Sequence, residues 1–106
     1  MIKDCQVDDA LKFMRDNAEE LSAAMGQSKY LDHKRKIVRS QIFLEYDGTV
    51  AEREAKAETS DEYRKVVDEI LEAETLKSLL QTQFKRAEMT IELYRTESAN
   101  QRRGNI

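Results

Sequence analysis

The sequence contains no proline and only three glycines among its 106 residues, so few positions can interrupt a helix. A single cysteine excludes an internal disulfide and any zinc site built from several cysteines. A two-layer α/β enzyme needs β-strands, in which apolar and polar residues alternate, and glycine-rich turns. The sequence has neither. No apolar stretch approaches the roughly 18 residues that indicate a membrane span. These absences predict one small all-α domain, residues 1–106, that makes no membrane contact.

The N-terminal residues do not look like a targeting segment. Residues 1–5 lack the basic flank and the apolar run of a secretory signal. The lone cysteine fits a reducing compartment, where disulfides are rare. We therefore expect a cytoplasmic protein.

Turn and capping signals divide the chain into three helices. Gly48 closes a turn-like cluster, and Thr49 and Glu52 have the spacing of a capping box. Thr59 and Glu62 repeat that spacing further along the chain. The predicted elements are a long helix over 7–46 with a kink or a break near 26, a short corner helix over 50–58, a long helix over 61–101 and a flexible tail over 102–106.

Apolar residues recur every three or four positions along both long runs, as they do on one face of a helix. The stripe of the first run contains Val7, Leu11, Met14, Ala18, Leu21 and Met25, and it shifts at Gly26 to Tyr30, Ile37 and Leu44. The stripe of the second run contains Tyr63, Val66, Ile70, Ala73, Leu76, Leu80, Phe84, Ala87, Ile91 and Tyr94. We expect the two stripes to meet in a long antiparallel, coiled-coil-like helical hairpin.

Charge supports the antiparallel arrangement. The net charge is −3 over 1–25 (three basic and six acidic residues) and +2 over 26–51 (five and three). It is −5 over 52–74 (four and nine) and +3 over 75–106 (six and three). A chain that doubles back at the corner places segments of opposite sign side by side, whereas a parallel arrangement places like signs together.

A two-helix hairpin gives each helix only one neighbour, so it buries its apolar stripes poorly. Further apolar residues lie off the stripes, and they define a predicted self-association face: Val67, Leu71, Leu79, Phe43 and Leu93. The simplest outcome is a twofold-symmetric homodimer that forms a four-helix assembly. The alternative is a monomer that offers this surface to a different protein.

Residue types that carry catalysis are sparse. His33 has no second histidine beside it, and Cys5 lies before the first long run. Two acid pairs have the spacing of metal-binding bundles, Glu69 with Glu72 and Glu88 with Glu92. Both pairs flank the apolar stripe, as charged residues do on any solvated hairpin. We expect no catalytic residue, cofactor or metal, with a metal-dependent nucleotide hydrolase as an alternative.

Basic residues form two clusters, from which the candidate nucleic-acid contacts are Lys34, Arg35, Lys36, Arg39, Arg95, Arg102 and Arg103. Basic helices can track phosphates, and an interleaved aromatic such as Tyr30 can stack on an unpaired base. However, the net charge is −3, and the antiparallel arrangement places each cluster beside acidic residues. Weak, salt-sensitive binding of single-stranded nucleic acid is therefore an alternative function.

Four segments share features with one known family. They are Tyr30-Leu31 at the start of a basic stretch, the corner 48–55, the helix start 60–63 and the ending 91–100. The most specific part is the corner Ala-Glu-Arg-Glu-Ala at 51–55, combined with Ile91-Glu92 before an aromatic and an arginine. Together they resemble a family of small, uncharacterised helical proteins of tailed bacteriophages and prophages. Its relatives often carry tryptophan where Tyr94 stands, and proline where Asp61 stands.

The family's genes lie near recombination and replication genes, so the resemblance implies a DNA-metabolism accessory inside a bacterial host cell, without implying any catalytic residue. The sequence thus predicts a non-catalytic interaction protein that acts through helix-mediated contacts with an unknown phage or host protein.

Overall fold

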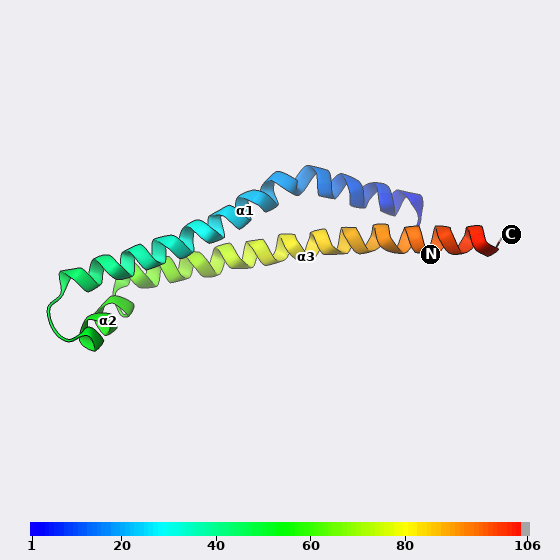
Figure 1. Ribbon diagram of the computed structural model, residues 1–106. Coiled ribbons are helices and arrows are strands. Elements are labelled where there is room, and N and C mark those ends of the chain that lie inside the picture. Colours follow the sequence, from blue (N-terminus) through cyan, green and yellow to red (C-terminus); the bar gives the residue numbers. More distant parts are fainter. Residues whose placement is uncertain (105–106) are drawn as a thin grey trace. The chain divides into compact units, whose positions relative to one another are not determined.

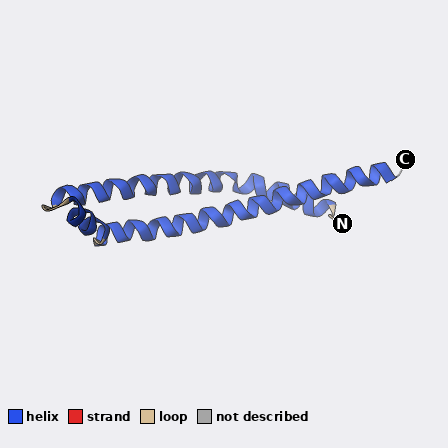
Figure 2. Cartoon of the chain, turned by 60° about the horizontal axis from the view of Figure 1, so that its bottom comes forward, coloured by secondary structure: helices blue, strands red, loops and turns tan. Residues whose placement is uncertain are grey.

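The computed structural model describes residues 1–104, which form three α-helices (Figure 1 and Figure 2). Helix α1 spans Asp4–Glu45, α2 spans Val50–Glu58 and α3 spans Asp61–Gly104. No strand occurs within these described residues. The predicted all-α helical hairpin with a short helix at its corner is confirmed.

The short helix has the predicted bounds. Helix α1 begins three residues earlier and ends one residue earlier than predicted, and α3 ends three residues later. Helix α1 is unbroken at Gly26, where a Cβ atom would meet nothing within 4 Å, so the glycine lies on an open helix face. Helix α3 continues through Arg102 and Arg103, and Arg102 Nε donates to the Ser98 carbonyl at 3.4 Å. The predicted tail is therefore helical as far as Gly104, and its residues 105–106 lie outside the described residues.

The corner between α1 and α2 depends on a glycine and a threonine. Gly48 has a φ of +131°, a conformation that strains residues with a side chain. The Thr49 hydroxyl accepts a hydrogen bond from the Glu52 backbone N–H at 3.2 Å and caps α2 as predicted. At the next start, the cap is Ser60 instead of Thr59, because Ser60 Oγ accepts from the Tyr63 N–H at 3.3 Å.

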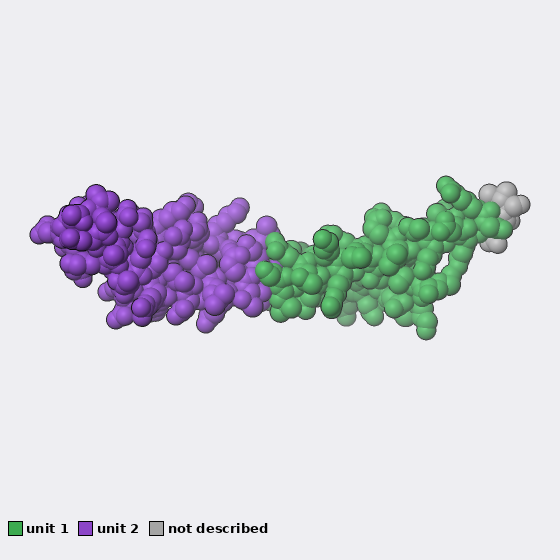
Figure 3. Space-filling model, turned by 90° about the horizontal axis from the view of Figure 1, so that it is seen from below, with its two compact units in different colours: residues 1–22, 78–106 green, residues 23–77 purple. Residues whose placement is uncertain are grey.

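The chain forms two compact units, coloured separately in Figure 3. Unit 1 combines residues 1–22 with the chain from Ser78 onward, and unit 2 comprises residues 23–77. Unit 1 thus joins the acidic first segment to the basic last one, and unit 2 joins the basic and acidic middle segments. One ion pair among the described residues links α1 to α3, between Lys34 and Glu69 at 3.3 Å. The packing of apolar side chains therefore does more than ion pairs to hold the helices together.

Each long helix packs through a heptad seam, defined as its buried or half-buried positions spaced alternately three and four apart. The seam of α1 contains residues 7, 10, 14, 17, 21, 24, 28, 31, 35, 38 and 42. That of α3 contains residues 63, 66, 70, 73, 77, 80, 84, 87, 91, 94 and 98. The second predicted stripe is correct except at Leu76, which is 46% exposed while Lys77 takes the seam position.

The first predicted stripe needs a larger correction. Its positions at 7, 14 and 21 lie in the seam, but Leu11, Ala18 and Met25 are exposed, and the seam positions are 10, 17 and 24 instead. Beyond Gly26, Tyr30, Ile37 and Leu44 point outward, and their places in the seam go to residues 31, 38 and 42. The apparent shift at Gly26 arose because polar residues occupy seam positions 28 and 35, so counting only apolar residues followed the wrong face.

Both units have thin cores. The buried apolar residues of unit 1 are Ala10, Leu80 and Ala87, and those of unit 2 are Ala24, Leu31, Ile42, Ala57 and Val66. Half of these residues are alanines, which bury little apolar surface area because their side chain is a single methyl group. In unit 1 the rings of Phe13 and Phe84 add an edge-to-face contact with centroids 5.3 Å apart.

Candidate interaction surfaces

The four candidate contacts of the first basic cluster, Lys34, Arg35, Lys36 and Arg39, form ion pairs within unit 2. Lys34 Nζ lies 3.3 Å from Glu69 on α3, and Arg39 Nη2 lies 3.3 Å from Glu58 on α2. These pairs place two predicted nucleic-acid contacts beside acidic side chains of the same chain. The acidic partners therefore reduce the positive electrostatic potential that would attract a phosphate to this cluster.

The other two cations of this cluster converge on Asp32. Arg35 Nη2 and Lys36 Nζ lie 3.2 Å and 3.5 Å from its carboxylate oxygens. The hydrogen bond from Arg35, together with the charge of Lys36, lowers the pKa of Asp32. Arg35 Nη1 also donates to the Tyr63 hydroxyl at 3.3 Å, and the hydrogen bonds to Tyr63 and Asp32 raise the pKa of Arg35.

The second basic cluster is spread along α3. Arg95 Nη1 lies 3.6 Å from Glu92 on the same helix. Arg102 and Arg103 are exposed in the last turn and form no ion pair with any described residue. Cations in the last turn interact favourably with the helix dipole. Among the candidate nucleic-acid contacts, these two retain the most available charge.

The predicted self-association residues are distributed over both units. Val67 and Leu71 are 41% and 66% exposed on α3 in unit 2, and Leu79 and Leu93 are 55% and 51% exposed in unit 1. Phe43 is half-buried, because the Arg53 guanidinium lies 4.0 Å from its ring centroid. Four of these five residues are thus exposed, and Phe43 belongs mainly to the packing of the corner.

The chemically reactive residue types remain scattered. His33 and Cys5 are exposed, and Glu69 is engaged by Lys34. Glu72 shares with Glu69 the lining of a shallow hollow on unit 2. Across residues 1–104, no three histidine, cysteine or acidic side chains are gathered as metal ligands.

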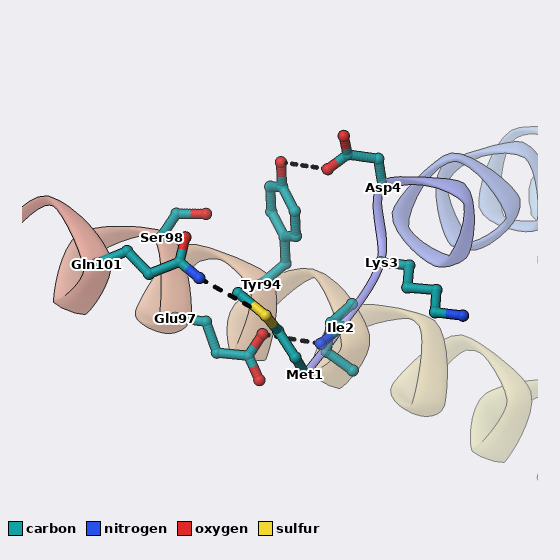
Figure 4. Close-up of a pocket in the computed structure, with 8 residues that line it drawn as sticks. All are labelled: Met1, Ile2, Lys3, Asp4, Tyr94, Glu97, Ser98 and Gln101. Carbon is teal, nitrogen blue, oxygen red and sulfur yellow. Dashed lines mark hydrogen bonds between the residues drawn. The ribbon is translucent and has the colours of Figure 1, made fainter.

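In unit 1, residues 1–4 lie against α3 and form a hollow of about 420 Å³ (Figure 4). The Ile2 backbone N–H donates to Glu97 Oε2 at 2.8 Å, and the Tyr94 hydroxyl donates to Asp4 at 2.7 Å. The hydrogen bond to Asp4 raises the pKa of Tyr94. These polar groups already pair with one another, so their contacts hold the N-terminal residues against α3.

A polar layer, formed by Ser28, Glu74 and Lys77, interrupts the seam of unit 2. Ser28 is 8% exposed and donates its hydroxyl hydrogen to the Glu74 carboxylate. Lys77 Nζ lies 3.0 Å from Glu74 Oε2 and 3.3 Å from Ser28 Oγ. These hydrogen bonds lower the pKa of Glu74, the bond from Ser28 most of all. Hydrophobic periodicity does not predict this layer, because none of its members is apolar.

An exposed apolar row on α1 is formed by Tyr30, Ile37 and Leu44. These residues are 60%, 57% and 76% exposed on α1. Their spacing of seven residues places them on one outer face of the helix, directed away from the seam. The sequence had indicated this periodicity, but the row was assigned to the core.

No protein-family model, curated protein or solved structure matches this chain. Among the described helices, none combines the length and apolarity required to traverse a bilayer.

Proposed function

We propose that this chain is a non-catalytic interaction protein of a bacteriophage or prophage, acting in the host cytoplasm through contacts made by its helices. The resemblance to the phage family supports the source, and the position of that family's genes supports an accessory role in DNA recombination or replication. The proposed partners are a second copy of the chain and a phage or host protein.

The observation that carries the proposal is the apolar surface of unit 2. Three large apolar side chains are buried in this unit, namely Leu31, Ile42 and Val66. Nine are exposed, namely Met25, Tyr30, Ile37, Leu44, Tyr46, Val50, Val67, Leu71 and Leu76. Single exposed apolar residues are ordinary, but a surplus of this kind marks contact surfaces for other proteins.

Affinity capture from phage-infected or lysogenic bacteria tests the partner. The bait is the tagged chain in nuclease-treated lysate, compared with a variant carrying Leu71→Glu and Leu76→Glu, both exposed on α3 in unit 2. The control, Thr75→Glu with Thr82→Glu, adds the same charge to exposed positions of α3 without removing apolar surface.

We expect a recombination or replication protein that the control retains and the leucine variant loses. Capture that survives in the leucine variant, or that nuclease abolishes, contradicts the proposal. Mg²⁺-dependent nucleotide turnover that Glu69→Ala or Glu72→Ala removes contradicts the non-catalytic assignment.

Direct binding of single-stranded nucleic acid is the second candidate, favoured by Arg102 and Arg103. In an electrophoretic shift assay, such binding would weaken steeply with salt and disappear in a variant with both arginines changed to glutamine. If no shift occurs at low salt, this candidate is eliminated.

A further inference from the structure

The outer face of α1 in unit 2 is unusually poor in charge. We define this face as the row Tyr30, Ile37 and Leu44 with the two heptad rows beside it, which are Gly26, His33 and Ser40, and Gln27, Lys34 and Gln41. Lys34 is the single formally charged residue among these nine, in a chain where 37% of residues are charged. Protein interfaces are depleted of charge in this way at their centres.

The matching rows of α3 in unit 2 have the opposite character. They contain Asp61, Glu62, Lys65, Asp68, Glu69, Glu72, Thr75 and Leu76. Six of these eight residues are charged, which is typical of a solvated face. The contrast assigns the contact surface to α1.

Two copies of a basic helix would ordinarily repel each other. Here Lys34, Arg35, Lys36 and Arg39 are each paired with an acidic side chain of the same chain. The hairpin supplies the acidic partners of Lys34 and Arg39. Asp32 on α1 itself offsets part of the charge of Arg35 and Lys36, which reduces the repulsion between two α1 helices.

We propose that the outer face of α1 binds the same face of a second copy, antiparallel, about a twofold axis at Ile37. Tyr30 and Leu44 lie seven residues on either side of Ile37, so Tyr30 of each copy meets Leu44 of the other copy across the axis. Each flanking row meets the same row of the partner in this arrangement, so His33 lies opposite Ser40 and Lys34 opposite Gln41, which pairs hydrogen-bond donors with acceptors. The acidic outer faces of α3 then remain on the outside of the dimer.

This inference rests on the self-association part of the proposed function, and it names the surface. It also leaves the exposed leucines of α3 free for a different protein. The predicted dimer face on Val67 and Leu71 is therefore replaced by a face on the other long helix.

Site-directed disulfide formation tests the axis, in a Cys5→Ser background because Cys5 is an exposed thiol. Residues on a twofold axis meet their own copies, so Ile37→Cys should give a disulfide-linked dimer under mild oxidation. Leu71→Cys, comparably exposed on α3, is the control and should stay largely unlinked. Tyr30→Cys mixed with Leu44→Cys should crosslink more than either variant alone.

Sedimentation velocity on the Cys5→Ser chain at concentrations up to ~100 µM separates the possible failures. A dimer that Ile37→Glu weakens more than about 100-fold, with helicity retained, supports the proposal, because two carboxylates would meet at the axis. A dimer that crosslinks through Leu71→Cys instead of Ile37→Cys overturns this face while self-association stands. A chain that stays monomeric at all concentrations overturns both this face and self-association. Binding of a different protein is then tested by the capture experiment alone.

Discussion

Ser28 donates a hydrogen bond to Glu74 in the seam of unit 2, where a heptad places apolar side chains. Lys77 completes this layer by contacting both residues. A sliding of α1 along α3 would leave the buried Ser28 hydroxyl without a partner, at a cost. The polar layer therefore favours one register of the two helices over its neighbours.

The polar layer makes stability depend on pH. Because the pKa of Glu74 is lowered in the folded chain, its contribution is present above the ordinary pKa of about 4.3 and is lost as the pH falls through the folded value. Glu74→Gln should lower the urea midpoint at pH 7 and have little effect in strong acid. The measurement is urea unfolding followed by circular dichroism at both extremes.

Glu72→Gln is the control, since Glu72 is exposed one position from the seam and forms no ion pair within residues 1–104. Its urea midpoint should stay near that of the wild type at both pH values. If the urea midpoint falls equally in the two variants at pH 7, the overall charge of the chain, and not the polar layer, is responsible.

The aromatic pair should be the main apolar contact between the two helical segments of unit 1. Phe84→Ala should reduce the free energy of unfolding by about 2 kcal/mol, less than a fully buried phenylalanine because the ring is half-buried. A double-mutant cycle with Phe13→Ala should give a coupling of roughly 0.5–1.5 kcal/mol. Met89→Ala, at an exposed position of α3, should cost less than about 0.5 kcal/mol. A coupling near zero would mean that the rings do not meet.

Arg53 fixes the corner through two contacts with one residue. Its guanidinium stacks on the Phe43 ring, and its Nε donates to the Phe43 carbonyl at 2.9 Å in the last turn of α1. Arg53→Lys should cost about 1–2 kcal/mol of unfolding free energy, because an ammonium cannot stack and donate with the same planar geometry. Arg64→Lys, at an exposed position of α3, is the comparison and should be neutral. Identical stabilities would refute this role.

The Tyr94–Asp4 hydrogen bond should be visible in the titration of the phenol. The pKa of Tyr94 is raised, so this bond stabilises the fold below the ordinary pKa of about 10, and its contribution is lost as the pH rises through the folded value. Asp4→Asn should shift the highest-pH phase of phenolate absorbance to lower pH. Tyr94→Phe should remove that phase, and its persistence would assign it to another tyrosine.

The sequence was sufficient for the helices because their ends are marked by local chemistry. Gly48 and Thr49 define the corner through backbone geometry and capping, and both effects depend only on nearby residues. The seam of α3 followed from its apolar spacing alone, apart from Leu76. The charge distribution also indicated which segments come together.

The seam of α1 could not be read in the same way, because its polar positions owe their burial to the other helix. Ser28 is buried with Glu74 as its partner, and Arg35 is half-buried beside Tyr63. Both partners lie on α3 and are distant in the sequence. Apolar spacing alone therefore places the exposed row of Tyr30, Ile37 and Leu44 in the core, although it forms the surface that we propose for self-association.

The central claim is that the heptad seam faces α3 while this apolar row faces outward. Nuclear Overhauser contacts between ring protons test it directly in a chain with only three phenylalanines and four tyrosines. We predict cross-peaks between the rings of Phe13 and Phe84, and none from the Tyr30 ring to any residue of α3. Cross-peaks from Tyr30 to α3, with none between the two phenylalanines, would contradict the seam and the surfaces inferred from it.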